Sequence, residues 1–222
     1  MLYYITYLTF YIFILVNLKL IETGESLPIM EHFYSIQGEG FNVGKPAYFI
    51  RIGGCDNGCS WCDVKESWDP QIHPVTNVNK IIIIIKQNNI DNVVITGGEP
   101  FKYNLNYLTE KLNKLNINIF IETSGTEPIT GRFHWLTFSP KINTKPLDIY
   151  YNIADELKII ISNESDFKWA EYNASKVKPY CKLYLQPEWS KQKQIMPLII
   201  NYILKNPQWS LSLQIHKYLN IP

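Results

Sequence analysis

The stretch "FIRIGGCDNGCSWCDVKESWD", residues 49–69, decides the fold, because it sets three cysteines at the end of an apolar run. Residues 46–54 are β-branched and aromatic and end in a glycine pair, which is typical of a buried strand. Cys55, Cys59 and Cys62 follow this strand as C-x3-C-x2-C, and the chain has only four cysteines in total. We therefore expect a strand that delivers a cysteine loop to one edge of a sheet.

The rest of the chain alternates between helical and extended patterns. Helices are predicted at 78–89 and at 104–116, where leucines at 105, 108, 112 and 115 follow amphipathic spacing. Apolar runs separated by stretches of helical length predict further strands at 92–100, 117–125, 135–140, 156–162, 182–187 and 209–214. This alternation predicts an α/β fold with a mostly parallel sheet and helices outside.

Polar or glycine-rich motifs follow five of the expected strands. They are "GGC" at 53–55, "TGGEP" at 96–100, "ETSG" at 122–125, "SPK" at 139–141 and "LQPEW" at 185–189. Parallel sheets bind ligands at the carboxyl ends of their strands. We expect these motifs to meet in one site.

Length and composition indicate one domain at 18–222. The chain has 222 residues, of which 46% are hydrophobic and 18% charged, and its net charge is +1. This length suits one sizeable core. Charged residues form no basic stripe, so nucleic acid is not an expected partner.

Residues 1–17 form an atypical hydrophobic N-terminal extension. It opens with "MLYYITYLTFYIFILV", shorter than the roughly 20 apolar residues that span a bilayer and without the basic start of a secretory signal. A membrane anchor, an added hydrophobic element and a start codon assigned too early all remain open. Membrane contact is not our expectation.

The cysteine loop is better suited to an iron–sulfur cluster than to a disulfide or zinc. Three cysteines are an odd number, and Cys181 lies far along the chain. Structural zinc takes four protein ligands, so it would need a residue such as His73 as the fourth. Three thiolates can instead hold three irons of a [4Fe-4S] cube and leave one iron open.

The loop, with Trp61 before its last cysteine, resembles the cluster loop of radical S-adenosylmethionine enzymes. "GGEP" at 97–100 stands where that superfamily lines the methionine end of the cofactor. A more specific resemblance, from about residue 18 to the end, is to the 7-carboxy-7-deazaguanine synthase family. It rests on "EHFYSIQGEG" at 31–40, "VVITGGEP", "ETSGT", "SPK", "LQPEWS" and the ending "WSLSLQIHKYLNIP".

This resemblance implies a partial (β/α) barrel that binds a [4Fe-4S] cluster and S-adenosylmethionine. The implied activity is a carbon–nitrogen lyase that converts 6-carboxy-5,6,7,8-tetrahydropterin to 7-carboxy-7-deazaguanine and releases ammonia, in queuosine or other 7-deazapurine biosynthesis. The expected radical abstracts the hydrogen at C6 of the pterin. A homodimer, an electron donor such as flavodoxin or ferredoxin, and a cytoplasmic location are implied too.

The resemblance also assigns site residues. The cluster ligands are Cys55, Cys59 and Cys62. The expected cofactor-binding residues are Trp61, Cys62, Asp63, Gly98, Ser124, Ser139, Pro140 and Lys141. The expected substrate-binding residues are Ile36, Gln37, Gly38, Glu39, Arg51, Thr96, Gln214, His216 and Pro222.

Three of these residues have plain structural alternatives. Arg51 offers a fork to the substrate carboxylate, or it pairs with an acidic neighbour. Lys141 is a cofactor residue or a surface lysine. His216 is a substrate residue or a histidine satisfied within the fold.

One position departs from the family pattern. Many members follow the last cysteine with Asp-Thr, and the threonine binds a Mg2+ that contacts the substrate, whereas this chain has Asp63 and Val64. Valine offers no side-chain oxygen to a metal that prefers oxygen ligands. Mg2+ is therefore an expected cofactor with no ligand residue assigned.

The sequence is also compatible with two other functions. A radical enzyme that activates a protein partner would share the cluster loop and "GGEP", but the "IQGEG" and tail motifs favour a small polar substrate. A binding module stabilised by a metal would need four protein ligands.

Overall fold

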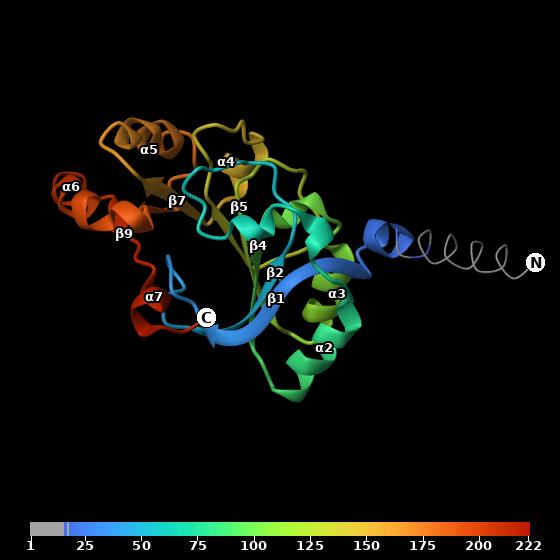
Figure 1. Cartoon of the computed structure of the whole chain (residues 1–222). Coiled ribbons are helices and arrows are strands. Elements are labelled where there is room, and N and C mark those ends of the chain that lie inside the picture. Colours follow the sequence, from blue (N-terminus) through green and yellow to red (C-terminus); the bar gives the residue numbers. More distant parts are fainter. Residues whose placement is uncertain (1–15, 17) are drawn as a thin grey trace, which may run out of the picture.

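One curved, mostly parallel sheet forms the centre of the described structure (Figure 1). Its strands, in spatial order, are β3 (Val75–Asn77), β1 (Ser26–Ile36), β2 (Pro46–Ile52), β4 (Asn92–Gly97), β5 (Asn118–Thr123), β6 (Trp135–Phe138), β7 (Glu156–Ile161), β8 (Lys182–Pro187) and β9 (Trp209–Leu211). All pairings from β2 to β9 are parallel, whereas β1 pairs antiparallel with β2 and β3. The predicted α/β class is confirmed, and the sheet is an open, partial barrel that ends at β3 and β9.

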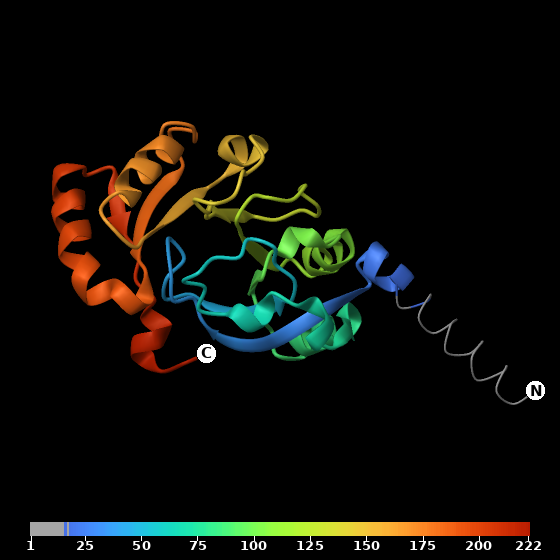
Figure 2. The ribbon, with the colours of Figure 1, turned by 45° about the horizontal axis from the view of Figure 1, so that its top comes forward.

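Helices α2 to α6, whose bounds follow, cover the convex side of this sheet, as Figure 2 shows. The α-helices are α2 (Val78–Gln87), α3 (Asn106–Lys114), α4 (Ile149–Ile153), α5 (Asp166–Ala174), α6 (Gln192–Lys205) and α7 (Ile215–Leu219). Residues 18–23 are also helical. Short 3-10 turns are η1 (Lys65–Ser67), η2 (Pro70–Ile72), η3 (Pro100–Lys102) and η4 (Trp189–Lys191).

The predicted helix of isoleucines illustrates why these elements form. In α2, Val78, Ile81 and Ile85 are buried at helical spacing. The Asn77 side chain accepts a hydrogen bond from Asn79 N at 2.9 Å and so caps the first turn. Packing of one apolar face outweighs the low helix propensity of β-branched residues.

Strand alternation separates a helix-covered core from a concave inner face. In β2, Ile50 and Ile52 are fully buried in the main core, while Phe49 and Arg51 line a cavity on the other side. Because side chains alternate between the two faces of a strand, Thr96 of β4, Glu122 of β5, and Lys158 and Ile160 of β7 also reach that cavity. Val94 and Phe120 pack with Phe49 in a smaller cluster on the inner face.

The antiparallel strands β1 and β3 are absent from the predicted set. β1 mixes polar and apolar residues, and its register against β2 shifts between Ile29 and Glu31. Its partner β2 was predicted correctly. Phe33 of β1 and Phe49 of β2 stack with ring centroids 5.3 Å apart, and this contact stabilises the β1–β2 pair on the inner face of the sheet.

The computed structural model describes residue 16 and residues 18–222. The expected extension at 1–17 therefore lies outside the described residues, except for Val16. Within these limits, no helix is both long and apolar enough to traverse a bilayer.

Candidate active site

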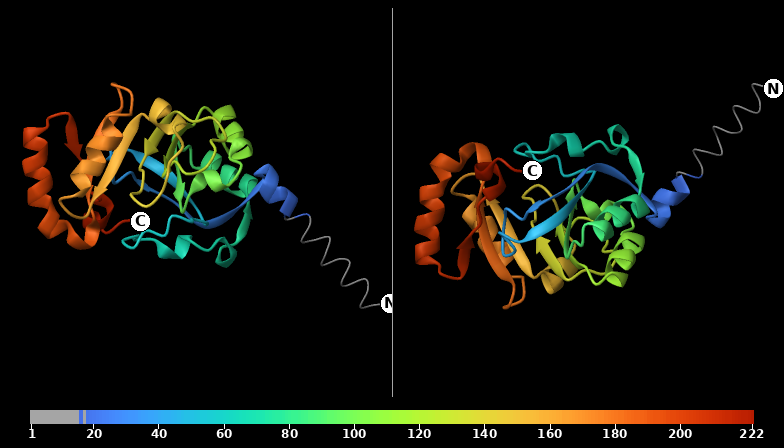
Figure 3. Two further views of the ribbon diagram at one scale, coloured as in Figure 1. Left: turned by 90° about the horizontal axis from the view of Figure 1, so that it is seen from above. Right: turned by 90° about the horizontal axis from the view of Figure 1, so that it is seen from below.

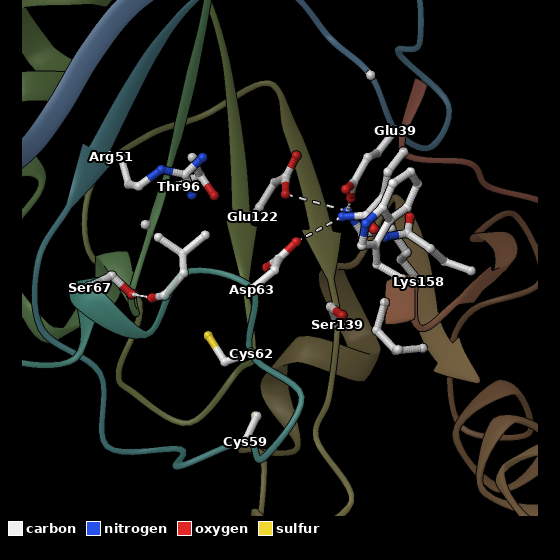
Figure 4. A pocket seen from close by; sticks show the side chains of 18 of the residues that line it. Glu39, Arg51, Cys59, Cys62, Asp63, Ser67, Thr96, Glu122, Ser139 and Lys158 are labelled. Carbon is white, nitrogen blue, oxygen red and sulfur yellow. Dashed lines mark hydrogen bonds and ion pairs between the residues drawn. The ribbon is translucent and has the colours of Figure 1, made fainter. Parts of the chain in front are cut away.

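A cavity of about 340 Å³ opens on the concave face, where the parallel strands end. In both views of Figure 3, the C-terminal end of the chain lies beside the loop that follows β2. Its lining includes residues of all five predicted strand-end motifs, which confirms that they meet in one place. Its size lies within the range of small-molecule sites. In the close view of Figure 4, Arg51 and Thr96 lie on one side, Glu39 and Lys158 on the other, and Cys59 and Cys62 below them.

The cavity brings together nearly all of the residues predicted from the sequence. Its lining contains Ile36, Gln37, Gly38, Glu39, Arg51, Cys55, Cys59, Trp61, Cys62, Asp63, Thr96, Gly98, Ser124, Ser139, Lys141, Gln214, His216 and Pro222. Pro140 is buried between two lining residues and is not itself part of the lining.

The cysteine loop connects β2 to η1 and is held at both ends by backbone bonds. Gly54 N donates to Ser67 O at 2.6 Å, and Cys55 N donates to Trp68 O at 3.1 Å. Within the loop, Cys62 N donates to Cys59 O at 3.0 Å. The three thiols are half-buried, free and directed to one cavity.

Electrostatics around the thiols suit a cationic occupant. Burial raises the pKa of Cys55, and the charges of Glu99 and the other two cysteines raise it further. Burial also raises the pKa of Cys59, against the opposing effect of Lys141. Since thiolates are the ligand form, a bound positive centre such as iron is what would keep these groups deprotonated together.

Among the described residues, no group of three or more His, Cys, Asp or Glu side chains could hold a single metal ion. A [4Fe-4S] cube makes a different demand, because each cysteine binds its own iron. His73, the fourth ligand that zinc would require, is not in the cavity lining, and its Nε2 lies 2.7 Å from Glu66 O. The cysteine set fits the cluster.

Glycines bring the end of β4 against the cysteine loop. Gly97 has φ +139°, and a Cβ there would lie 2.1 Å from Ile52 O. A Cβ at Gly98 would lie 2.3 Å from Gly54 O and 3.0 Å from the Cβ of Cys55. Only glycine permits this close backbone approach.

Glu99 of the same motif forms its hydrogen bonds within the fold. One oxygen accepts from Thr123 Oγ1 at 2.6 Å, and the other accepts from Ser124 N at 2.8 Å. Glu99 is 2% exposed. It fixes the end of β5, from which the Ser124 hydroxyl also reaches Asn57 Nδ2 of the cysteine loop at 3.0 Å.

Lys141 is directed into the fold. Its ammonium donates to Ser139 Oγ at 2.8 Å and lies 5.5 Å from the ring centroid of Trp61. Burial lowers the pKa of Lys141, while the nearby Cys59 opposes that effect. These contacts join the segment after β6 to the cysteine loop.

Arg51 has the acidic neighbour that the sequence left open. Its Nε donates to Glu31 Oε1 at 2.6 Å across the β1–β2 pair. Within the described part of the chain, its two Nη atoms have no hydrogen-bond partner, and the residue lines the cavity. The ion pair with Glu31 orients the guanidinium and leaves the two Nη atoms of Arg51 available to a ligand.

The segment after β9 closes the cavity from the side of β1. Ile215 N donates to Gly38 O at 3.0 Å, and Ser35 Oγ donates to Pro222 O at 3.1 Å. Burial lowers the pKa of His216, with Glu39 opposing. A Cβ at Gly38 would lie 2.4 Å from His216 Nδ1, so the histidine packs directly on the "IQGEG" loop.

The same segment is tied to Asp63. Lys217 Nζ and Gln214 Nε2 both donate to Asp63 Oδ2, at 2.6 and 3.0 Å. Burial acts to raise the pKa of Asp63, but these two donors outweigh it and lower the pKa. Asp63, which follows the last of the three cysteines, is thus hydrogen-bonded to the segment after β9.

Sequence reasoning missed three charged residues of the inner face: Glu122, Glu156 and Lys158. Lys158 is buried, donates to Glu39, and lies 3.4 Å from Glu122 Oε2. The signal was available, because charged residues inside an apolar strand need partners. Glu156 and Lys158 stand at alternate positions of the predicted strand "ELKIIIS".

Comparisons with known proteins agree with this geometry. The family model of the radical SAM superfamily matches residues 49–131. The 7-carboxy-7-deazaguanine synthase of Flavobacterium psychrophilum is 50% identical over 91% of this chain and 96% of its own length. The enzyme of the same name from Escherichia coli K12 is 33% identical over 87% of this chain and 98% of its own. A crystal structure of QueE from Escherichia coli superposes with TM-score 0.73 and 28% identity, covering 89% of this chain and 97% of that one.

Proposed function

The chain belongs to the 7-carboxy-7-deazaguanine synthase family of radical SAM enzymes, and from that premise we propose how its cavity carries the activity. It is a carbon–nitrogen lyase of queuosine biosynthesis that converts 6-carboxy-5,6,7,8-tetrahydropterin to 7-carboxy-7-deazaguanine and ammonia. One observation carries the assignment to this site: the cysteine loop and the "IQGEG" loop, which carries Gln37 and Glu39, line the same cavity.

Cys55, Cys59 and Cys62 would hold the cluster through their thiolates, and S-adenosylmethionine would bind in the cavity that these cysteines line. When bound, the two groups together supply radical abstraction of a hydrogen from the substrate. We assign the amino-acid end of the cofactor to the polar groups nearest the cysteines. These are Asp63, Ser124, Ser139 and Lys141, with Trp61, Gly98 and Pro140 as packing neighbours.

Arg51 would bind the substrate carboxylate through its two Nη atoms. Support comes from the Glu31 contact, which uses Nε and keeps the guanidinium at the cavity edge. Gln37 and Glu39 would receive the polar edge of the pterin, with Ile36 and Gly38 beside them and Thr96 opposite. Gln214, His216 and Pro222 would cover the substrate and exclude water.

The residues present do not fit Mg2+. Val64 has no side-chain oxygen, and its carbonyl already accepts from Ser67 N at 3.1 Å and from Ser67 Oγ at 2.7 Å. One carboxylate oxygen of Asp63 accepts from Lys217 and Gln214. Mg2+ prefers a shell of oxygen ligands, which these two residues do not supply.

We further propose that residues 18–222 act as one domain, in the cytoplasm and as a homodimer. The four cysteines in the described structure are free, which suits a reducing compartment. Exposed Ile200 and Leu204, one turn apart on α6, offer apolar surface for a second copy. A flavodoxin- or ferredoxin-type electron donor follows from the family.

The activity is tested anaerobically with the iron-reconstituted protein, dithionite, S-adenosylmethionine and the pterin, read by mass spectrometry. We expect 7-carboxy-7-deazaguanine from the wild type and none from Cys59→Ala. Cys181→Ala is the matched control, since that buried thiol lies outside the cavity lining and should leave product formation intact. Product from the Cys59 variant at the wild-type rate would contradict the assignment.

A further inference from the structure

A buried lysine on the cavity wall connects two carboxylates from different parts of the chain. Lys158 lies in β7, its side chain 6% exposed, and its ammonium pairs with Glu39 of the loop after β1. The same nitrogen lies 3.4 Å from Glu122 Oε2 in β5. Figure 4 shows both carboxylates near the Lys158 ammonium.

Gln37 completes a closed ring of contacts with these three residues. Its Nε2 donates to Glu122 Oε1 at 2.9 Å, and its Oε1 accepts from the backbone N of Glu39 at 3.2 Å. Each member of the ring therefore has two fixed neighbours. A change at Lys158 frees both carboxylates and, through them, the amide.

The lysine also determines the charge of the pair. A carboxylate that is taken out of water stays ionised when a cation compensates it. Burial acts to raise the pKa of Glu39, but the Lys158 charge and hydrogen bond outweigh it and lower the pKa. Burial acts to lower the pKa of Lys158, but its carboxylate neighbours outweigh it and raise the pKa. Glu39 is thus kept as an acceptor, and the lysine holds Glu122 beside it by direct contact.

Paired anionic acceptors select a ligand edge that carries adjacent N–H donors. The aminopyrimidinone ring of a pterin has such an edge, formed by its 2-amino group and its ring N–H. Substrate and product share this ring, because the reaction rebuilds only the other ring. Interactions with the shared ring contribute equally to binding before and after the chemical step.

We propose that Lys158 is a positioning residue that holds Glu39 and Glu122 as a paired anionic acceptor for the aminopyrimidinone edge. This role rests on the proposed function of the cavity. It requires that loss of Lys158 weakens substrate and product alike and leaves the chemical step largely intact.

The test measures product binding and kinetics on the cluster-loaded enzyme. In Lys158→Met we expect both the Kd of 7-carboxy-7-deazaguanine by calorimetry and the KM of the pterin to rise about 10- to 100-fold, as for lost charge-assisted hydrogen bonds. We expect kcat to stay within about threefold, the pattern of lost uniform binding. Lys158→Arg keeps the charge and should recover most of the affinity. Lys114→Met, which breaks an exposed ion pair with Glu110, is the matched control and should bind as the wild type.

Two further results separate the possibilities. If Lys158→Met does not fold, the double variant Lys158→Met/Glu122→Gln removes one of the two carboxylate charges and so restores the net charge of the cluster; it should fold with the same loss of affinity. Product affinity within about threefold of wild type in either variant would overturn the positioning role, and so would a fall in kcat with KM unchanged. A wild type that binds neither pterin nor product would instead refute the proposed function on which the role rests.

Discussion

Glu156 predicts a measurable pH dependence of stability. Its side chain is buried beside the cavity, and one oxygen accepts from Phe41 N at 3.1 Å and from Trp135 Nε1 at 3.2 Å. The other oxygen has no partner among the described residues and faces Gly40, whose added Cβ would lie 2.0 Å away. Burial raises the pKa of Glu156 from 4.5 to about 7, although Lys158 opposes that effect.

A carboxyl whose pKa is higher in the folded than in the unfolded state stabilises the protein when protonated. Its contribution is complete below the unfolded pKa, 4.5, and is lost as the pH rises through about 7. From these two values, the wild type should lose about 2 kcal/mol of unfolding free energy between pH 5.5 and 8.5. Glu156→Gln keeps the shape without the charge and should lack this contribution.

The assay is the melting temperature of both proteins across that range. Relative to Glu156→Gln, the wild type should fall by about 4–8 °C from pH 5.5 to 8.5, since 1 kcal/mol corresponds to about 2–4 °C at this size. The comparison cancels the other titrating groups, which both proteins share. If the melting temperatures of the two proteins changed in parallel with pH, the reasoning would be refuted. If the wild type became more stable than Glu156→Gln as the pH rose, the sign of the Glu156 contribution would be the opposite of the one predicted.

Three other changes have defined outcomes. Gly98→Ala should lower the bound iron, measured by iron analysis, to below half of the wild-type content, because the added Cβ would lie 2.3 Å from Gly54 O beside Cys55. A variant with the full iron content would contradict this expectation. Added Mg2+ should change the turnover of the wild type by less than about twofold, whereas it should stimulate Val64→Thr, in which the threonine adds an oxygen ligand. Strong stimulation of the wild type would show that ligands other than residue 64 suffice to bind Mg2+. Arg51→Met should raise the pterin KM about 10- to 100-fold for a lost bidentate pair, and an unchanged KM would remove Arg51 from carboxylate binding.

The parallel strands and the cluster loop were predictable because each is local in sequence. Apolar runs ending in glycine mark β2 and β4, and the spacing of Cys55, Cys59 and Cys62 lies within one loop. Buried parallel strands give continuous apolar runs, which are easy to detect. These features needed no knowledge of distant contacts.

The antiparallel β1 and the charged ring depend on contacts far apart in sequence. Lys158 and Glu39 are separated by 119 positions, and neither reveals its partner. β1 has mixed polarity because one of its faces is only half-buried, so its pattern does not stand out. The rule that led us to expect a partner for Arg51 applies equally to Lys158, and only the fold identifies that partner.

The most direct test of the central claim follows the hydrogen at C6 of the substrate. The reconstituted enzyme is given 6-carboxytetrahydropterin carrying deuterium at C6, with S-adenosylmethionine and dithionite, under anaerobic conditions. We predict 7-carboxy-7-deazaguanine by mass spectrometry, with deuterium in the 5'-deoxyadenosyl group of the recovered cofactor or of 5'-deoxyadenosine. Product formed without deuterium in that group would contradict radical abstraction at C6, and no product from a protein with an intact cluster would contradict the assigned reaction.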